Sequence, residues 1–133
     1  MSVFKVKIVT PDGELFSADA KAILVKTDNG NVQILRSHAD YFAPLGTGPA
    51  KLTLEDGAVK HASCSGGFIS VKDGEVLVVA TTFEFSDNID RARAERAKER
   101  AEEQIKNAKS DDELRIAKAK LARALSRLSV ASL

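Results

Sequence analysis

Residues 89–94 read Ile-Asp-Arg-Ala-Arg-Ala, and the composition of the chain changes at this point. All of the glycine, proline and aromatic residues precede this stretch. After it, the chain consists mainly of alanine, leucine, isoleucine and charged residues. Glycine and proline mark turns, whereas alanine and long charged residues favour helices. We therefore expect an α+β protein, with an all-β domain over residues 1–85 and a helical domain over residues 86–133.

Through residue 85, apolar and polar residues alternate, which is typical of strands with one buried face. The expected strands are residues 4–9, a return strand beginning at 15–16, and residues 20–27, 32–35, 51–54, 59–63, 68–71 and 76–82. Short turn signals separate several of them: Asp-Gly at 12–13, 56–57 and 73–74, and Asn-Gly at 29–30. We expect a polar loop at residues 36–43 and an irregular connection or edge strand at 44–49. Many short antiparallel strands at this spacing predict an antiparallel β-sandwich.

From Asp87 onward the apolar period changes to 3.6 residues, as in amphipathic helices. Two stripes predict two helices: Ala94, Ala97, Ala101, Ile105 and Ala108, then Leu114, Ala117, Leu121, Leu125 and Leu128. Ser110 and Glu113 have the spacing of a capping box, and Ser86-Asp87 is expected to cap the first helix in the same way. The short break near Lys109 predicts an antiparallel two-helix hairpin. Because the first stripe is mostly alanine, it buries little apolar area, and we expect a mobile hairpin that is able to open.

The charge of the chain is nearly balanced, with a formal net charge of +1. The balance hides an asymmetry, because residues 1–86 carry eight Lys and Arg against ten Asp and Glu, and residues 87–133 carry twelve against nine. A dedicated nucleic-acid-binding protein usually has a clear basic excess. The tail also interleaves its basic residues with glutamates and has no aromatic residue for base stacking. We therefore expect no nucleic-acid partner.

The sequence offers no candidate site for catalysis and no segment for direct membrane insertion. The first residues contain no apolar signal core, and the longest apolar run, residues 76–80, is far shorter than the roughly 20 residues that cross a bilayer. Cys64 is the only cysteine, and His38 and His61 stand without a ligand pattern of cysteine or acidic residues. We expect structural or surface roles for all three and no metal site. No segment matches a nucleophile elbow or a phosphate-binding loop, so we expect a protein that is not an enzyme.

Seven of the eight arginines lie in the helical segment, and their spacing is informative. Arg93 and Arg100 are seven residues apart and share a face of the first helix, whereas Arg123 and Arg127 are four apart and share a face of the second. If the chain turns near Lys109, Arg93 comes level with residue 125 and lies between Arg123 and Arg127. Three guanidinium groups then converge, with Arg100 about two turns away. Such a cluster is suited to bind phosphate, because each planar guanidinium offers two parallel donors.

Other residues at the open end of this hairpin would complete a small-molecule site. Glu84 and Asp90 are placed to accept hydrogen bonds from a nucleobase amino group or from ribose hydroxyls. Ile89 and Ala94 would give an apolar wall to a ring. The alternative is a solvated helix in which the arginines pair with glutamates at helical spacing. The residues of that alternative are Arg91, Arg96 and Arg100 with Glu95, Glu99 and Glu103.

The chain resembles the epsilon subunits of bacterial F-type ATP synthases over its whole length. The resemblance rests on the alternating residues 4–13, on Gly-Gly-Phe at 66–68 followed by a strand, and on residues 89–94, which fit the pattern Ile/Leu-Asp-x-x-Arg-Ala. In this family the last pattern implies an ATP site on the folded helical hairpin. The residues so implied are Glu84, Ile89, Asp90, Arg93, Ala94, Arg100, Arg123 and Arg127. ATP would be a regulatory ligand, and the resemblance leaves open whether Mg²⁺ accompanies it.

The resemblance further implies a non-catalytic rotor subunit of the central stalk, peripheral to the cytoplasmic face of the bacterial plasma membrane. The β-sandwich would contact the gamma subunit and the c-ring. The tail would either fold as an ATP-binding hairpin or extend along gamma to the catalytic alpha and beta subunits, where it would inhibit ATP hydrolysis. The alternative is a purely structural rotor subunit whose tail binds no nucleotide.

Two segments depart from the family pattern. Gln33 stands where a glycine is usual, and residues 38–44 differ from the usual His-Ala-Pro beginning. Both departures concern the surface that would meet partner subunits and lie outside the expected ATP site.

Overall fold

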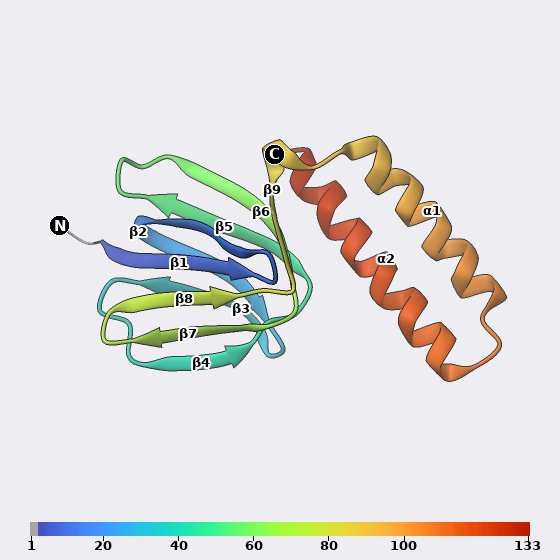
Figure 1. Ribbon diagram of the computed structural model, residues 1–133, viewed down its shortest axis with the longest axis horizontal. Coiled ribbons are helices and arrows are strands. Elements are labelled where there is room, and N and C mark those ends of the chain that lie inside the picture. The colour runs from blue at the N-terminus through green and yellow to red at the C-terminus, as the bar shows by residue number, and fades with distance from the viewer. Residues whose placement is uncertain (1–2) are drawn as a thin grey trace.

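The computed structural model describes residues 3–133 and places nine strands before two α-helices. The strands are β1 (Phe4–Thr10), β2 (Gly13–Thr27), β3 (Gly30–Leu35), β4 (Tyr41–Pro44), β5 (Gly48–Leu54), β6 (Val59–Ser65), β7 (Phe68–Lys72), β8 (Glu75–Val79) and β9 (Thr82–Phe85). A 3-10 turn, η1 (Ser86–Asn88), leads to α1 (Arg91–Asn107) and α2 (Asp111–Ala131). Figure 1 shows the two helices lying side by side at one end of the strands. The predicted α+β class, with a helical hairpin after the β domain, is confirmed. Met1 and Ser2, which the expected β domain included, lie outside the described residues.

The 15-residue strand β2 joins the two layers of the β domain. Its first half pairs with β1 and its second half with β3 and β5. The strand order is β4-β7-β8-β1-β2-β5-β6-β9, with β3 also paired to β2. One continuous sheet therefore folds over on itself around the core. The sequence indicates two strands here because large apolar residues are missing over residues 17–19, but the backbone pairing continues through them.

One strand pair departs from the expected antiparallel pattern. β1 and β8 are parallel, from Lys5 opposite Glu75 to Val9 opposite Val79. A tight turn forces antiparallel pairing only on the two strands that it joins. Because six other strands lie between β1 and β8 in the chain, no turn constrains their relative direction.

Two strand borders also differ from expectation. The expected loop at residues 36–43 contains the beginning of β4, which pairs with β7 and buries only Ala43 of its four residues. Such a short strand shows no recognisable period in the sequence. The expected strand at residues 76–82 is divided into the end of β8 and the beginning of β9. Ala80 lies between them and donates its backbone N–H to the carbonyl oxygen of Val9 at 2.9 Å. After this bond the chain leaves β1 and continues as β9, which pairs with β6.

The core is one apolar cluster enclosed by both layers, and its fully buried side chains include Ile8, Ile23, Leu52 and Ile69. β6 differs from the other strands because residues 62–65 are all buried. Successive side chains of a strand point to opposite faces, so alternate residues of β6 enter the core and the others lie under α2, which packs on β5 and β6. The side of the sheet that carries Ser63 is therefore a docking face for the hairpin.

Cys64 has the structural role that the sequence predicts. Its side chain is buried in the core, and this burial raises the pKa of the thiol from 9.0 to about 12. The thiolate is the reactive species, so we expect a thiol reagent at pH 8 to label the native protein much more slowly than the urea-unfolded chain. Rapid labelling of the native protein would contradict this assignment.

The same shift predicts a pH dependence of stability. Because the pKa is higher in the folded state, the contribution of the neutral thiol is intact below pH 9.0 and is lost as the pH rises toward about 12. The difference in unfolding free energy between the parent and Cys64→Ala should therefore shrink over that window, and urea titrations at a series of pH values would measure it.

α1 begins later than expected and has a different cap. Ser86 and Asp87 belong to η1, so the expected cap at these residues is wrong. The cap is Asp90, whose side chain accepts a hydrogen bond from the backbone N–H of Arg93 at 3.0 Å. The reason is that β9 extends to Phe85, and the chain needs the turn of η1 before it can enter the helix.

The predicted cap of α2 is confirmed, since the Ser110 side chain accepts from the N–H of Glu113 at 3.1 Å. The Glu113 side chain folds back as expected but accepts from the N–H of Lys109, one residue before the cap, at 2.8 Å. The buried helix residues are small ones: Ala94, Ala101, Ala117, Ala124, Ser126 and Val130. Leu125, expected in the apolar stripe, is instead 46% exposed because its neighbour Ala124 takes the inward position. The predicted alanine-rich helix contact is confirmed.

Among the helices that the structure describes, none combines the length and hydropathy needed to cross a membrane.

Candidate functional site

A hollow of about 320 Å³ lies where the hairpin meets the sheet. Small-molecule sites usually fall between about 300 and 1,000 Å³. The hollow is lined by Glu84, Asn88, Ile89, Asp90, Arg93, Ala94, Ala97, Arg100 and Arg127. Seven of the eight residues that the sequence implies for ATP binding are thus brought together, although they are spread over three structural elements and a connection.

Each element supplies side chains from a different direction. β9 contributes Glu84, and the connection to α1 contributes the stretch that ends at Asp90. α1 presents Arg93 and Arg100 on one face, two turns apart, and α2 contributes Arg127. The N-terminus of α1, which is the positive end of the helix dipole, opens on the same hollow. The carboxylate of Asp90 already caps this end, so the arginines supply most of the attraction for an anion.

Arg127 and Glu84 form the strongest polar contact in the hollow. Nε of Arg127 donates to Oε1 of Glu84 at 2.6 Å, and the two side chains are 29% and 36% exposed. A charge-assisted bond of this length fixes the orientation of both groups. Because only Nε is used, the two terminal nitrogens of Arg127 remain able to donate to a ligand.

Arg93 and Arg100 are the unpaired cations of the site. Within residues 3–133, neither guanidinium forms a hydrogen bond or an ion pair, and both side chains are exposed. Three arginines therefore face two carboxylates, of which one is paired and the other caps a helix. This arrangement has the capacity to bind an anion with several negative charges.

The alternative of helical ion pairs does not describe α1. Among the described residues, the single ion pair within a helix joins Arg115 to Asp112 at 3.8 Å in α2. The glutamates of α1 form none with its arginines. Exposed pairs at helical spacing contribute only about 0.3–0.5 kcal/mol, which is too little to hold long side chains in one geometry.

Arg123 is the one implied residue that the hollow does not include. It lies on α2 one turn before Arg127 and is half-buried. Of the arginines expected to converge, Arg93 and Arg127 line the hollow together with Arg100. Four residues move a helical position about 6 Å along the axis, so one turn suffices to take a side chain out of a small site.

Two lining residues were not expected from the sequence. Ala97 shares the face of α1 that carries Arg93 and Arg100. Its spacing from these two arginines would therefore have been enough to predict it as a lining residue. Asn88 lies in η1, and no periodicity marks it. Its position depends on how β9 leads into α1.

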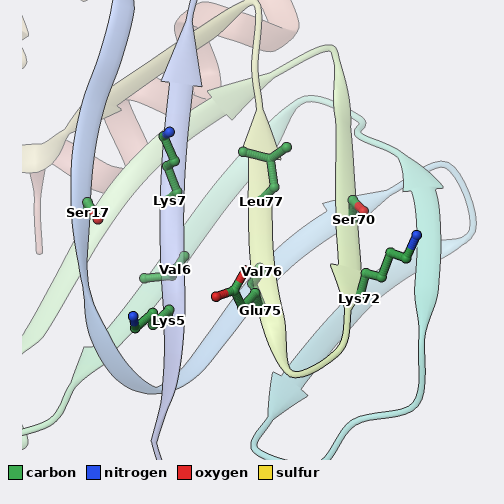
Figure 2. A pocket seen from close by; sticks show the side chains of 9 residues that line it. All are labelled: Lys5, Val6, Lys7, Ser17, Ser70, Lys72, Glu75, Val76 and Leu77. Atoms are coloured by element: carbon green, nitrogen blue, oxygen red, sulfur yellow. The ribbon is translucent and has the colours of Figure 1, made fainter.

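A second hollow, of about 400 Å³, is lined by residues of β1, β2, β7 and β8, whereas α2 packs on β5 and β6. Figure 2 shows Leu77 of β8 between Lys7 of β1 and Ser70 of β7. These residues form one cross-strand row, because Lys7 and Ser70 both pair with Leu77 and Phe42 of β4 pairs with Ser70. Phe42 is 65% exposed. This outer face thus presents apolar side chains among lysine and serine.

Comparisons with known proteins agree with this arrangement. Residues 3–86 match the beta-sandwich domain of the ATP synthase delta/epsilon chain, and residues 87–132 match its long alpha-helix domain. The ATP synthase epsilon chain of Ruminococcus albus is 41% identical over 133 residues, which cover 99% of this chain and 98% of the relative. That of Bacillus subtilis is 39% identical over 131 residues, which cover 98% of each chain.

Solved structures support the same fold. A chain from the OSCP/F1/c-ring part of the Euglena gracilis mitochondrial ATP synthase has a TM-score of 0.82 at 22% identity, over 96% of this chain and 80% of that one. A chain from the central stalk and c-ring of the Tetrahymena thermophila mitochondrial ATP synthase has a TM-score of 0.66 at 18% identity, over 96% and 95%. With the family models and the bacterial relatives, the conclusion is direct: the chain belongs to the epsilon-chain family of the F-type ATP synthases.

Proposed function

We propose that this chain is a non-catalytic rotor subunit of the central stalk, which couples rotation to ATP synthesis, and that its helical hairpin is an ATP-responsive inhibitor of ATP hydrolysis. The observation that supports the ATP-dependent part is the convergence of Arg93, Arg100 and Arg127 on one hollow, with two of the three unpaired. Triphosphate is the polyanion for which such a cluster is suited.

The site exists only while the hairpin is folded. Glu84 belongs to β9, Arg93 and Arg100 to α1, and Arg127 to α2, so extension of the helices separates the groups of these three elements from one another. ATP that binds only the folded form stabilises it by RT ln(1 + [ATP]/Kd). Each arginine–phosphate bond contributes about 1.5–3 kcal/mol. Against this, the contact between α1 and α2 buries mainly alanine and is weak, so ATP binding is able to decide between two states of the tail.

Inhibition follows from the released state. When ATP falls, the hairpin leaves the sheet, and the arginines that faced phosphate become free to meet acidic surfaces of the catalytic alpha and beta subunits. An extended tail along gamma would then block rotation in the direction of hydrolysis. The chain would thereby conserve ATP when the cell has little of it.

The β domain is the part of the chain that would attach the hairpin to the rest of the complex. We propose that it contacts the gamma subunit and the c-ring at the cytoplasmic face of the bacterial plasma membrane, as a peripheral part of the complex. The outer face that carries Leu77 and the exposed Phe42 supports such contacts, because apolar side chains in the open favour protein partners.

A purely structural rotor subunit is the second candidate, and one observation favours it. Arg127 and Glu84 already satisfy each other at 2.6 Å, so the folded hairpin has a polar contact with the sheet that requires no nucleotide. In this case Arg93 and Arg100 would be surface charges. The two candidates differ in whether the isolated chain binds ATP.

Calorimetric titration of the intact chain with ATP separates them. We expect saturable heat below millimolar ATP, with no release of phosphate, because the site has cations for binding and no group placed for catalysis. Titrations with and without Mg²⁺ would show whether the metal accompanies the nucleotide. Absence of heat at millimolar ATP under both conditions would leave the structural candidate.

A further inference from the structure

A buried pair of hydroxyl groups joins the hairpin to the sheet. The Oγ atoms of Ser63 on β6 and Ser126 on α2 lie 2.8 Å apart, and the residues are only 5% and 6% exposed. Either hydroxyl is able to donate. The other buried residues of α2 are alanine and valine, so this bond is the polar contact within an otherwise apolar helix face.

The hydroxyl pair lies directly beside the ion pair of the candidate site. Ser63 is opposite Glu84 in the pairing of β6 with β9, and directly opposite residues of an antiparallel pair lie on the same face of the sheet. Ser126 and Arg127 are consecutive on α2. Two neighbouring residues of the sheet therefore meet two neighbouring residues of the helix, one contact buried and the other partly exposed.

We propose that the Ser63–Ser126 pair is a positioning contact, which sets the rotation and height of α2 on the sheet and thereby holds Arg127 against Glu84. Apolar contacts are not directional, and the small side chains of this interface tolerate a slide or a rotation. A shift of α2 by one residue turns Ser126 by about 100° away from Ser63 and leaves the buried hydroxyl of Ser63 without a partner. The hydroxyl pair thus selects one register among several that alanine packing would allow.

The two serines are not equivalent when one is removed. A serine within a helix is able to donate to the carbonyl oxygen four residues earlier, so Ser126 has a substitute partner when Ser63 is absent. Ser63 lies on a strand and has no such local acceptor. Ser126→Ala should therefore disturb docking more than Ser63→Ala. Replacing both serines removes both polar groups and restores an apolar contact without restoring the register.

The experiment uses the intact chain without nucleotide, so its outcome is independent of whether ATP binds. Four proteins are compared: the parent, Ser63→Ala, Ser126→Ala and the double variant. Hydrogen–deuterium exchange of the α2 amides measures opening of the hairpin, with the β2 amides as an internal reference. The NMR signal of the Arg127 Nε–H measures the bond to Glu84. Ser129→Ala is the matched control, because its hydroxyl bonds to the carbonyl oxygen of Ser126 within α2 and not to the sheet.

We expect exchange of the α2 amides to rise about tenfold in Ser126→Ala, less in Ser63→Ala, and to return to within about threefold of the parent in the double variant. The Arg127 Nε–H signal should nevertheless remain altered in the double variant, because docking is restored but its register is not. The control should match the parent in both measurements.

Three outcomes would overturn the proposal. Parent-like exchange in both single variants would mean that the hydroxyl pair is not needed for docking. A double variant as labile as Ser126→Ala would mean that the pair holds α2 rather than positions it. A parent-like Arg127 signal in the double variant would mean that apolar packing alone sets the register.

Discussion

Replacement of Arg127 by alanine is expected to weaken ATP binding by at least tenfold. A tenfold loss corresponds to about 1.4 kcal/mol, and one hydrogen bond to a charged group contributes about 1.5–3 kcal/mol. The substitution also leaves the carboxylate of Glu84, now without its 2.6 Å partner, beside the bound phosphates. Both effects act in the same direction. Calorimetric titration of the parent and variant chains measures the ratio of the two dissociation constants.

The arrangement of the hollow supplies matched variants for this measurement. Arg93→Ala should lose about as much as Arg127→Ala, because its guanidinium has no other partner among the described residues. Arg123→Ala is the control, since Arg123 lies on the same helix outside the hollow and its loss should leave binding within about threefold of the parent. Arg127→Lys should be intermediate, because lysine keeps the charge but loses the planar fork of donors.

Two results would contradict this account of the site. If Arg93→Ala and Arg127→Ala both bind ATP like the parent, the arginine cluster is not the phosphate site. If Arg123→Ala costs as much as Arg127→Ala, the nucleotide-bound hairpin brings Arg123 into the site, as its spacing in the sequence suggests.

Gly67→Ala is expected to destabilise the β domain by more than the usual range of single substitutions, about 4 kcal/mol or more. Gly67 precedes β7 with φ at +88°, a conformation that costs an L-residue about 1–2 kcal/mol. An added Cβ would in addition overlap the carbonyl oxygen of Val79 at the end of β8. Val79 is paired with Phe68, and the carbonyl oxygen of Gly67 accepts from the N–H of Leu45, so neither side is able to move without breaking backbone hydrogen bonds of the sheet. Urea unfolding measures the loss.

Gly74→Ala separates the cost of the backbone conformation from the cost of the steric overlap. Gly74 lies in the turn between β7 and β8 with φ at +78°, and a Cβ there would meet nothing within 4 Å. It should cost only the conformational term of about 1–2 kcal/mol. If Gly67→Ala costs no more than Gly74→Ala, the overlap with Val79 relaxes and the close approach of the two strands is not rigid.

Features that depend on residues close together in the chain were predictable from the sequence. Alternation of apolar and polar residues and the Asp-Gly turns predicted most of the strands, and the spacing of Ser110 and Glu113 predicted the start of α2. Each of these signals needs only a few consecutive positions, because local backbone geometry fixes which residues share a face. The family resemblance, which includes residues 89–94, implied eight site residues, and seven of these eight line one hollow.

Features that depend on the meeting of distant segments emerged only in the folded chain. The continuity of β2, the parallel pairing of β1 with β8 and the cap at Asp90 depend on how strands join across the sheet. Arg123 is not among the residues that line the hollow, and Ser126 contacts Ser63. Both facts depend on the height and rotation of α2 on the sheet, which cannot be read from the helical period. A period gives the face of an element, whereas the register of one element on another is set by the pairwise contacts that only the folded chain brings within hydrogen-bonding distance.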